Sequence, residues 1–330
     1  MDILSTQNLS VGYRKNEDIY PVIENLNVNL KAGSLVSLIG ANGIGKSTLL
    51  RTLAGSQKPL KGKVLIDGND ISRIPRHKLA NLLSMVYTDR TQAGGLTARE
   101  IVGLGRQPHT GFLGRMSSHD REVIESAMKS AGIIHKANSF LAELSDGERQ
   151  KVMIAKALAQ ETPLIILDEP TAFLDVASRA EAMILLHDLA HKFNKAILLS
   201  SHDLSQSILL ADELWVVSSS RTLLCGNTED IILSGAMDEM FDTSRIEFDL
   251  KIGDFKVNLP AKMDVNLICP NNILCHWITN ALNRNGFNIN KNASLKISVQ
   301  SSSDISLESA NGCCQVNSIA ELVTSLKKAQ

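Results

Sequence analysis

The sequence predicts an α/β fold: a mostly parallel sheet with flanking antiparallel strands over residues 1–240, followed by a small α+β domain over 241–330. Two observations support this prediction. Apolar runs without polar alternation are typical of parallel strands that helices cover on both faces. Four such runs occupy residues 35–39, 82–87, 164–167 and 196–199. After residue 240 the pattern changes to strict alternation, which is typical of antiparallel strands.

Between these runs, the sequence predicts one hairpin and one helical insertion. Asp67 and Gly68 form a dipeptide typical of tight turns, so antiparallel strands are expected on both sides of it. Residues 89–160 are expected to be mostly helical. There, Thr97 and Glu100 form a capping box, in which each side chain satisfies a backbone amide at a helix start. Helical spacing of apolar residues continues over 120–131 and 149–160.

The α+β domain is predicted element by element from its own patterns. Alternation around a turn predicts a β-hairpin over 246–259. Helical spacing begins at Ile273 and extends to Gly286, a residue typical of helix ends. A strand over 295–299 and a final helix capped by Ser318 are expected to complete the domain.

The composition indicates a folded, nearly neutral protein. Lys and Arg total 34 against 35 Asp and Glu, a net charge of −1, which argues against binding nucleic acid or acidic membrane through the overall field. With 44% hydrophobic residues the chain has material for buried cores, so a disordered chain is excluded. No window reaches the roughly 18 apolar residues of a membrane span. A secretory signal is not expected either, because no basic stretch leads into an apolar run at the start.

Residues 40–47 carry a phosphate-binding motif. They fit the pattern G-x-x-x-x-G-K followed by Ser or Thr, after an apolar strand and before a helix. Glycines let backbone amides converge on phosphate oxygens, and the helix N-terminus adds partial positive charge. The alternative, a chance glycine-rich turn, is disfavoured by this strand–loop–helix context. Lys46 supplies charge for the terminal phosphates, and the Ser47 hydroxyl binds Mg²⁺. The predicted nucleotide-binding residues here are Gly40, Asn42, Gly43, Gly45, Lys46, Ser47 and Thr48.

Polar side chains follow two further apolar runs. Asp168 can hold the Mg²⁺ shell, and Glu169 can orient or deprotonate an attacking water. His202 can hydrogen-bond a γ-phosphate oxygen or that water. Alone, an acid or a histidine at a strand end has an ordinary structural explanation. Because the carboxyl ends of parallel strands meet at one sheet edge, Lys46, Glu169 and His202 are expected to converge there as catalytic residues.

The segment LSDGE over residues 144–148 allows two interpretations. Ser145 and Glu148 form a second capping box, which is sufficient reason for both residues. The same helix start, with its Ser145 hydroxyl and Gly147 amide, can also bind an anion. Spacing alone does not separate the two.

In their order along the chain, these motifs resemble the ATP-binding cassette (ABC) ATPases over about residues 1–240. A phosphate loop is followed by an LSGGQ-like pentapeptide, then by LIILDEP and SHD. The resemblance implies a P-loop cassette fold, with ATP and Mg²⁺ as cofactors. It also implies a head-to-tail dimer, in which each ATP lies between one phosphate loop and the Ser145 and Gly147 of the second chain. Tyr13 would then stack on adenine, and residues 172–175 would form a turn at the dimer interface.

Three segments depart from the usual pattern of this family. In the phosphate loop, Ile44 replaces a more usual small residue, which we expect to be tolerated because this position contributes mainly a backbone amide. The family has Gln where this sequence has Thr88, followed by Asp89, so Thr88 is the metal contact that the resemblance implies. Asp146 and Glu148 replace Gly and Gln in the pentapeptide. They add negative charge near a triphosphate, which would weaken the closed dimer unless Arg149 offsets it.

Residues 96–109 resemble the helical region of cassettes that serve importers of iron-siderophore, haem and cobalamin. The resemblance implies an ATP-hydrolysing subunit that drives uptake of such a metal chelate. The implied partners are a second copy in a homodimer, two integral membrane permease subunits and, indirectly, a substrate-binding protein. The implied location is the cytoplasmic face of the inner membrane, peripherally bound, and no nucleic-acid partner is expected.

Two other classes of function fit part of the sequence. A soluble ABC-type nucleotide switch acting on nucleic acid or ribosomes predicts two cassettes in one chain or basic arms, and the sequence has neither. A small-molecule kinase could use the phosphate loop, but that function leaves the LSDGE and SHD segments unexplained.

Five cysteines, an odd number without framework spacing, suit a reducing cytoplasm better than a disulfide scaffold. Four lie beyond residue 260: Cys269, Cys275, Cys313 and Cys314. A metal sensor is one interpretation, but adjacent cysteines chelate poorly and the sequence has no C-x-x-C pair. We instead expect Cys269 and Cys275 to act as small, buried hydrophobic residues. The last domain is expected to modulate or dimerise the ATPase.

Overall fold

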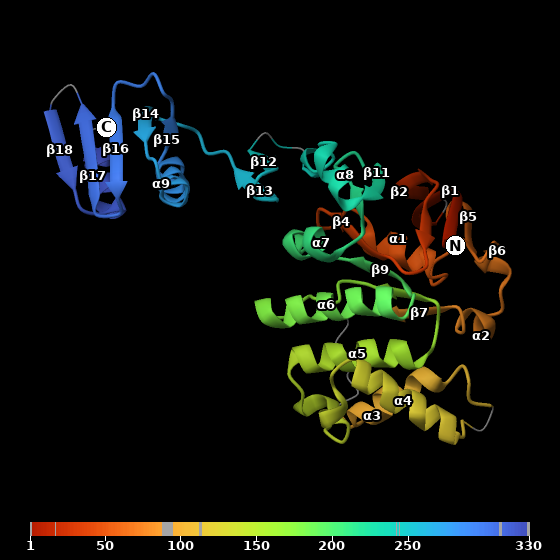
Figure 1. The fold of residues 1–330 in the computed structure, drawn as a ribbon. Coiled ribbons are helices and arrows are strands. Elements are labelled where there is room, and N and C mark those ends of the chain that lie inside the picture. Colours follow the sequence, from red (N-terminus) through yellow and green to blue (C-terminus); the bar gives the residue numbers. More distant parts are fainter. Residues whose placement is uncertain are drawn as a thin grey trace. The chain divides into compact units, whose positions relative to one another are not determined.

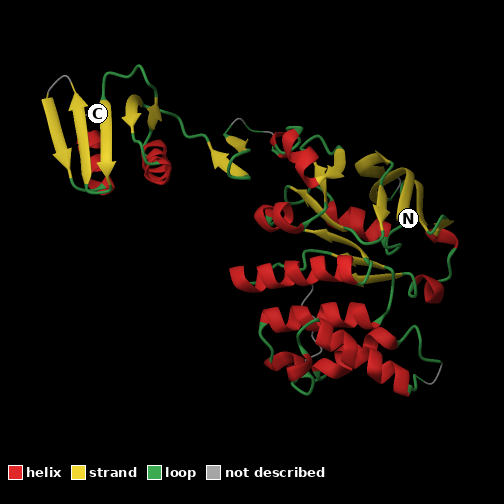
Figure 2. Cartoon of the chain, in the orientation of Figure 1, coloured by secondary structure: helices red, strands yellow, loops and turns green. Residues whose placement is uncertain are grey.

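The computed structural model describes residues 2–16, 18–87, 95–111, 114–241, 243, 245–309 and 312–328. The chain divides into two compact units, drawn in Figures 1 and 2. The first comprises residues 1–242 and 248–255, and the second comprises residues 243–247 and 256–330. None of the helices within the described ranges is long and apolar enough to cross a lipid bilayer.

The centre of the first unit is a six-stranded sheet in the order β11-β10-β4-β9-β8-β7, with only β11 antiparallel. Its strands are β4 (Leu35–Gly40), β7 (Leu83–Val86), β8 (Leu164–Leu167), β9 (Ala196–Ser200), β10 (Glu213–Val217) and β11 (Leu223–Asn227). The four apolar runs predicted as parallel strands are confirmed and adjoin one another. Strands β4, β8 and β9 are buried at every position, which explains why they lack polar alternation.

An antiparallel sheet shares one apolar core with this central sheet and with α1. Its strands are β1 (Asp2–Lys15), β2 (Asp18–Leu26), β3 (Asn29–Lys31), β5 (Lys61–Ile66) and β6 (Asn69–Asp70). The predicted hairpin is confirmed between β5 and β6. Its turn residues, Asp67 and Gly68, both have positive φ (47° and 76°), as a two-residue hairpin turn requires.

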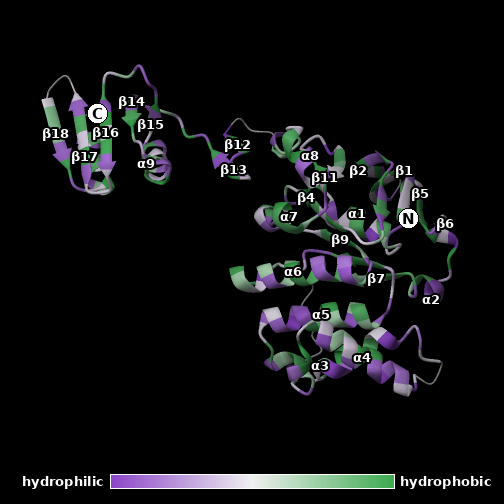
Figure 3. Ribbon diagram, viewed as in Figure 1, coloured by the Kyte–Doolittle hydropathy of each residue, from purple (hydrophilic) through white to green (hydrophobic). Residues whose placement is uncertain are grey.

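Helices surround the central sheet and form a separate layer below it in Figure 1. The helices of the first unit are α1 (Lys46–Leu53), α2 (Arg76–Leu79), α3 (Ala98–Gly103), α4 (Ser118–Ser130), α5 (Asp146–Ala159), α6 (Val176–Lys192), α7 (Leu204–Leu210) and α8 (Thr228–Leu233). The helices predicted over 120–131 and 149–160 are thus confirmed as α4 and α5. Helices α3, α4 and α5 each begin with a capping box, at Thr97, Ser117 and Ser145. They mix apolar and polar residues (Figure 3) and bury the apolar ones in a cluster of their own.

The second unit contains a five-stranded sheet in the order β15-β14-β16-β17-β18, with two helices. Its elements are β14 (Met263–Ile268), α9 (Asn272–Arg284), β15 (Phe287–Ile289), β16 (Lys296–Ser301), β17 (Asp304–Ser309), β18 (Gly312–Val316) and α10 (Ile319–Lys328). The predicted helices and the strand at β16 are confirmed. Ser318 caps α10 by accepting a hydrogen bond from the amide of Glu321, at 3.1 Å. The predicted hairpin is β12 (Ile246–Asp249) and β13 (Asp254–Val257), which pair with each other and with no further strand among the described residues.

The cysteines differ from expectation in their burial. Cys269 and Cys275 are only half-buried, although Cys269 packs against the core of the second unit. Cys313 and Cys314 are exposed because they lie on β18, which is the edge strand of the sheet. Among the residues that the structure describes, no three His, Cys, Asp or Glu side chains gather where they could hold a metal ion.

Candidate functional site

The phosphate-binding motif forms the turn between β4 and α1. Gly45, the N-cap residue of α1, has a φ of 119°, and a Cβ there would lie 2.0 Å from Val22 Cγ1. Glycine is therefore required, since any other residue would both clash and adopt a strained backbone. The turn presents backbone amides at a helix N-terminus, which is the arrangement that binds phosphate groups.

Lys46 is buried at the start of α1. Its Nζ donates hydrogen bonds to the carbonyl oxygens of Gly40, at 2.8 Å, and Ala41, at 3.3 Å. Burial lowers the pKa of Lys46, while the nearby carboxylates of Glu169 and Asp168 raise it. An anion bound in the loop would act in the same direction as these carboxylates and stabilise the ammonium form.

Asp168 follows β8 and connects the phosphate loop to β9. Its Oδ1 accepts hydrogen bonds from Ser47 Oγ at 3.0 Å and from Ser200 Oγ at 2.9 Å. A hydroxyl and a carboxylate oxygen side by side fit Mg²⁺, because that ion prefers oxygen ligands. The third predicted metal contact, Thr88, and its neighbour Asp89 lie outside the described residues.

Glu169 and His202 form a hydrogen-bonded pair beside Asp168. His202 Nε2 lies 2.5 Å from Glu169 Oε1, and both side chains are partly open to solvent. Glu169 has a φ of 50°, a left-handed conformation that costs a non-glycine residue about 1–3 kcal/mol. The surrounding hydrogen bonds hold it there: its amide donates to Ser200 Oγ at 2.8 Å. Glu169 and His202, which follow two different strands, therefore meet at the sheet edge as the sequence predicted.

Ser200 is a site residue that the sequence reasoning missed. It is fully buried, and its hydroxyl donates to Asp168 while accepting from the amide of Glu169. One side chain thus holds both acids in register. The available signal was a serine at the end of an otherwise apolar strand, where a polar group needs a partner.

Tyr13 lies at the end of β1, beside the start of α1. Its hydroxyl hydrogen-bonds the hydroxyl of Thr48, which is buried. The residue keeps 49% of its surface exposed, so an aromatic face remains available next to the phosphate loop. Adenine stacking on this ring stays a prediction.

Ser145 and Gly147 begin α5 in the helical layer. The Ser145 capping box is present, with the amide of Glu148 donating to Ser145 Oγ at 3.2 Å. A Cβ at Gly147 would lie 2.9 Å from Ser178 Oγ, so the position favours glycine. In the part of the chain that the structure describes, no hydrogen bond joins either residue to the phosphate loop of the same chain.

Asp146 and Glu148, the acidic residues at this helix start, each form an ion pair with a basic side chain. Arg149 Nη1 lies 3.1 Å from Asp146 Oδ1, and Lys136 Nζ lies 3.1 Å from Glu148 Oε1. Hydrogen bonding from the backbone amide of Ser145, together with Lys136, holds the pKa of Glu148 below its usual value. The extra negative charge noted in the sequence is therefore offset locally, by Lys136 as well as by the expected Arg149.

A cavity of about 420 Å³ adjoins His202. The phosphate loop, the turn after β9 and the β12–β13 hairpin line it, together with Arg179 of α6. The residues of the turn are Ser201, His202 and Asp203, those from the start of α7 are Leu204 and Ser205, and those of the hairpin are Asp254 and Phe255.

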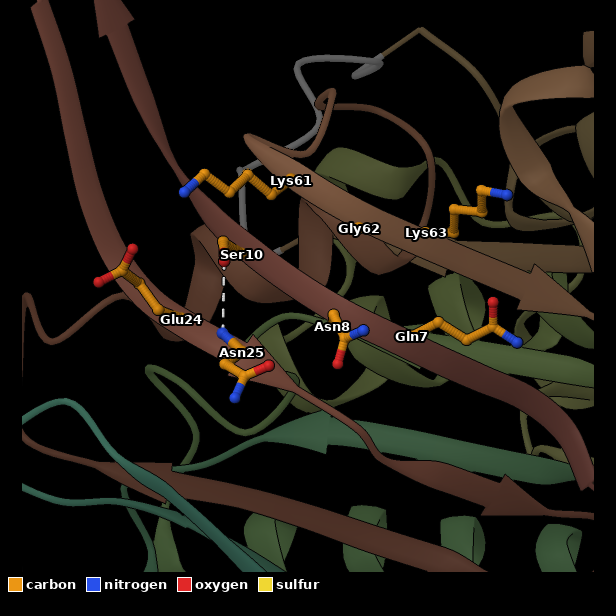
Figure 4. Close-up of a pocket in the computed structure, with 8 residues that line it drawn as sticks. All are labelled: Gln7, Asn8, Ser10, Glu24, Asn25, Lys61, Gly62 and Lys63. Carbon is orange, nitrogen blue, oxygen red and sulfur yellow. Dashed lines mark hydrogen bonds between the residues drawn. The ribbon is translucent and has the colours of Figure 1, made fainter.

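A second polar cavity, of about 670 Å³, lies in the antiparallel sheet (Figure 4). The strands are irregular there, and Ser10 Oγ accepts a hydrogen bond from the amide of Asn25 at 3.3 Å. Its lining residues are Gln7, Asn8, Ser10, Glu24, Asn25, Lys61, Gly62 and Lys63. None of the predicted site residues is among them.

Comparison with known proteins identifies two families that this chain matches. Over residues 23–172 the chain matches the family described as ABC transporter, and over 262–327 the family described as iron ABC transporter C-terminal domain. The ferric enterobactin transport ATP-binding protein of Escherichia coli is 34% identical over 238 residues, which are 72% of this chain and 86% of that protein.

Two solved structures share the fold. One is part of an ABC transporter complex from Clostridium perfringens, with a TM-score of 0.63 and 27% identity, covering 72% of this chain and 92% of the other. The second is the dimeric structure of a bacterial ABC transporter cassette, with a TM-score of 0.60 and 27% identity, covering 68% of this chain and 98% of the other.

Fold and site together define an ATPase with a phosphate loop and a paired acid and histidine at the edge of a parallel sheet. The chain belongs to the ABC transporter family, and it is an ATP-binding subunit of such a transporter. The family that the order of its motifs predicted is thereby confirmed.

Proposed function

We propose that this subunit hydrolyses MgATP to drive uptake of an iron-siderophore, haem or cobalamin-type chelate through separate membrane subunits. The observation that carries the proposal is the hydrogen-bonded set at the sheet edge. Ser47 and Ser200 both bond Asp168, and His202 bonds Glu169, immediately beside the buried Lys46. A metal-binding pair, an acid and a histidine next to a phosphate loop are the parts that ATP hydrolysis requires.

Each of these residues has a role in the proposed reaction. Lys46 and the amides of the phosphate loop bind the terminal phosphates of ATP. Ser47 and Asp168 would hold Mg²⁺, which neutralises charge on those phosphates when it is bound. Glu169 orients and deprotonates the attacking water, and His202 holds Glu169 and contacts the γ-phosphate. Their fixed geometry stabilises the charge that develops during transfer.

A second copy of the chain completes the nucleotide site in this proposal. The Ser145 and Gly147 of one copy would face the phosphate loop of the other, with Tyr13 stacked on adenine. The dimeric cassette to which this chain is similar supports the arrangement. The ion pairs of Asp146 and Glu148 also support it, because they remove charge that would repel a triphosphate.

The cargo and partners are inferred from the relatives. A match to an iron ABC transporter C-terminal domain and similarity to a ferric enterobactin transport protein both favour an iron chelate. We infer that two integral membrane permease subunits bind the ATPase dimer at the cytoplasmic face of the membrane. A substrate-binding protein would act through those permeases.

Purification of the tagged chain from detergent-solubilised membranes tests this proposal. We expect a polytopic membrane protein to copurify, whereas recovery of ribosomes or nucleic acid alone would favour the soluble nucleotide switch instead. Vesicles that contain the recovered complex should then be offered labelled ferric siderophore, haem and cobalamin. ATP-dependent uptake of one of them is expected, and uptake of none would contradict the proposed cargo.

A further inference from the structure

The β12–β13 hairpin lies after the cassette in the sequence but packs with the catalytic unit. Residues 248–255 cluster with the first unit, while the segments on either side belong to the second. The hairpin pairs with no other strand in the described part of the chain. A two-stranded hairpin is at best marginally stable alone, so side-chain packing must hold it in place.

Three aromatic rings provide that packing. The ring of Phe255 meets those of Phe241 and Phe248 edge-on, with centroids 5.0 Å and 5.3 Å apart. Edge-to-face pairs of this kind add stability beyond the apolar area they bury. The amide of Phe248 also donates to Asp238 Oδ1 at 2.8 Å, which fixes β12 to the end of the cassette.

The same cluster reaches the helix that follows His202. Leu204 and Ile208 of α7 and Phe255 of the hairpin all pack against one apolar cluster, whose buried members include Phe248 and Ile39 at the end of β4. The turn of the hairpin also faces α7, because a Cβ at Gly253 would lie 3.9 Å from Ile208 Cδ1. The hairpin and α7 therefore share one apolar cluster, and the hairpin turn lies near Ile208.

Helix α7 is joined rigidly to His202 by its cap. Asp203, the next residue, accepts a hydrogen bond from the amide of Gln206 at 3.0 Å, and its carbonyl accepts from Ser207 Oγ at 2.8 Å. Its amide donates in turn to Ser201 Oγ at 2.9 Å. A shift of α7 would therefore carry the His202 backbone with it.

The hairpin and the turn that carries His202 line the same cavity. Asp254 and Phe255 form one wall, and the turn after β9 with the start of α7, residues 201–205, forms another. With open space on this side, the turn is not held in place by close packing there. The hairpin is thus the wall that faces the His202 turn across this cavity.

We propose that Phe255 is a positioning residue for His202: the β12–β13 hairpin, through α7, sets the alignment of His202 with Glu169 during ATP hydrolysis. This inference rests on the proposed function of His202. Strand β13 also carries the chain from Phe255 of the first unit to Lys256 of the second.

Steady-state ATP hydrolysis by full-length variants tests the proposal. Phe255→Ala should lower kcat about tenfold, because small misplacements of catalytic groups are costly, and should leave the KM for ATP within about twofold. Phe255→Leu, which restores apolar volume, should recover at least about half of the lost kcat. Val257→Ala, an exposed position on the same strand, should behave as wild type. Thermal unfolding of each variant identifies the temperature range in which all are folded.

A double-mutant cycle separates positioning from general damage. In the His202→Ala background, Phe255→Ala should have little further effect, because its route to the reaction is already lost. An equal loss of kcat in both backgrounds, or a Phe255→Leu variant no better than Phe255→Ala, would overturn the inference. If kcat falls in His202→Ala but not in Phe255→Ala, the inference about Phe255 is wrong while the proposed function of His202 stands. A fully active His202→Ala would contradict the proposed function itself.

Discussion

At the scale of single residues, the strongest expectation concerns Glu169. Glu169→Gln keeps the size of the side chain and the hydrogen bond that the backbone amide donates to Ser200 Oγ, but a side-chain amide is a poor base. ATP turnover should fall about 100-fold or more, while ATP binding persists and traps the dimer. Phosphate release and size-exclusion chromatography with ATP measure the two effects. Glu122→Gln, on the exposed side of α4, is the matched control. Undiminished turnover would remove Glu169 from the mechanism.

The sequence predicted that polar residues would meet at one edge of the sheet, and the structure brings Asp168, Glu169 and His202 together there. The motif residues Lys46, Asp168 and His202 could be recognised because their chemistry and their places after apolar strands coincide. Ser200 could not, because its role depends on two acids, 31 and 32 residues away, that meet it only in the folded sheet. The left-handed backbone of Glu169 was also invisible, since no local rule favours it in a glutamate.

At the scale of elements, residues 96–109, the segment that resembles chelate importers, contain an arginine that connects helices of the helical layer. Arg106 is 2% exposed; it donates to Asp120 Oδ1 at 2.9 Å, to Glu161 Oε2 at 2.6 Å and to the carbonyl of Ala159 at 2.7 Å. One side chain therefore joins α4 to the end of α5. His109 Nε2 adds a contact with the carbonyl of Gln160 at 2.9 Å.

Arg106→Leu should consequently loosen the helical layer. The substitution leaves polar partners without their cation, and breaking a buried ion pair is costly. We expect the thermal midpoint of unfolding to fall by about 5–10 °C. Arg121→Leu, on the exposed side of α4, is the control and should change it little. Equal midpoints for the two variants would show that Arg106 does not hold these helices together.

The ion pair between Arg106 and Asp120 also predicts that the stability of the fold depends on pH. Hydrogen bonds from Ser117, and then from Arg106, hold the pKa of Asp120 well below its ordinary value of 3.8. A carboxyl whose folded pKa is depressed adds stability above its ordinary pKa, and that stability is lost as pH falls toward the folded value. The difference in unfolding free energy between wild type and Asp120→Asn should therefore be constant from about pH 7 to 5 and shrink below about pH 4. Urea unfolding across this range measures it. A gap that stays constant down to pH 3 would contradict the depressed pKa.

Helices and strands were predictable where their hydrophobic pattern was regular. Strands β4, β8 and β9 are uniformly apolar, so the sequence indicated both their type and their burial. Strands β17 and β18 escaped prediction because serines, acids and cysteines fill their exposed positions. The pairing of β10 with β4 was also unpredictable, since it joins segments more than 170 residues apart.

At the scale of the whole molecule, the proposed head-to-tail dimer makes a prediction that a site within a single chain does not make. Lys46→Ala disables the phosphate loop but leaves α5 intact. Ser145→Asp keeps an N-cap, since Asp caps helices as well as Ser does, but places a negative charge where the partner's triphosphate would lie. Each variant alone should be inactive. Mixed in equal amounts, half of the dimers would pair one intact phosphate loop with one intact Ser145.

The mixture should therefore recover about a quarter of the wild-type ATPase activity, because one site in four is whole after random pairing. Phosphate release from the two variants, separately and mixed, measures this directly. Ser117→Asp is the control: it changes the N-cap of α4 in the same way, and it should stay active alone. If the mixture shows only the summed activity of its components, Ser145 does not act across an interface, and each chain would have to hydrolyse ATP with its own residues.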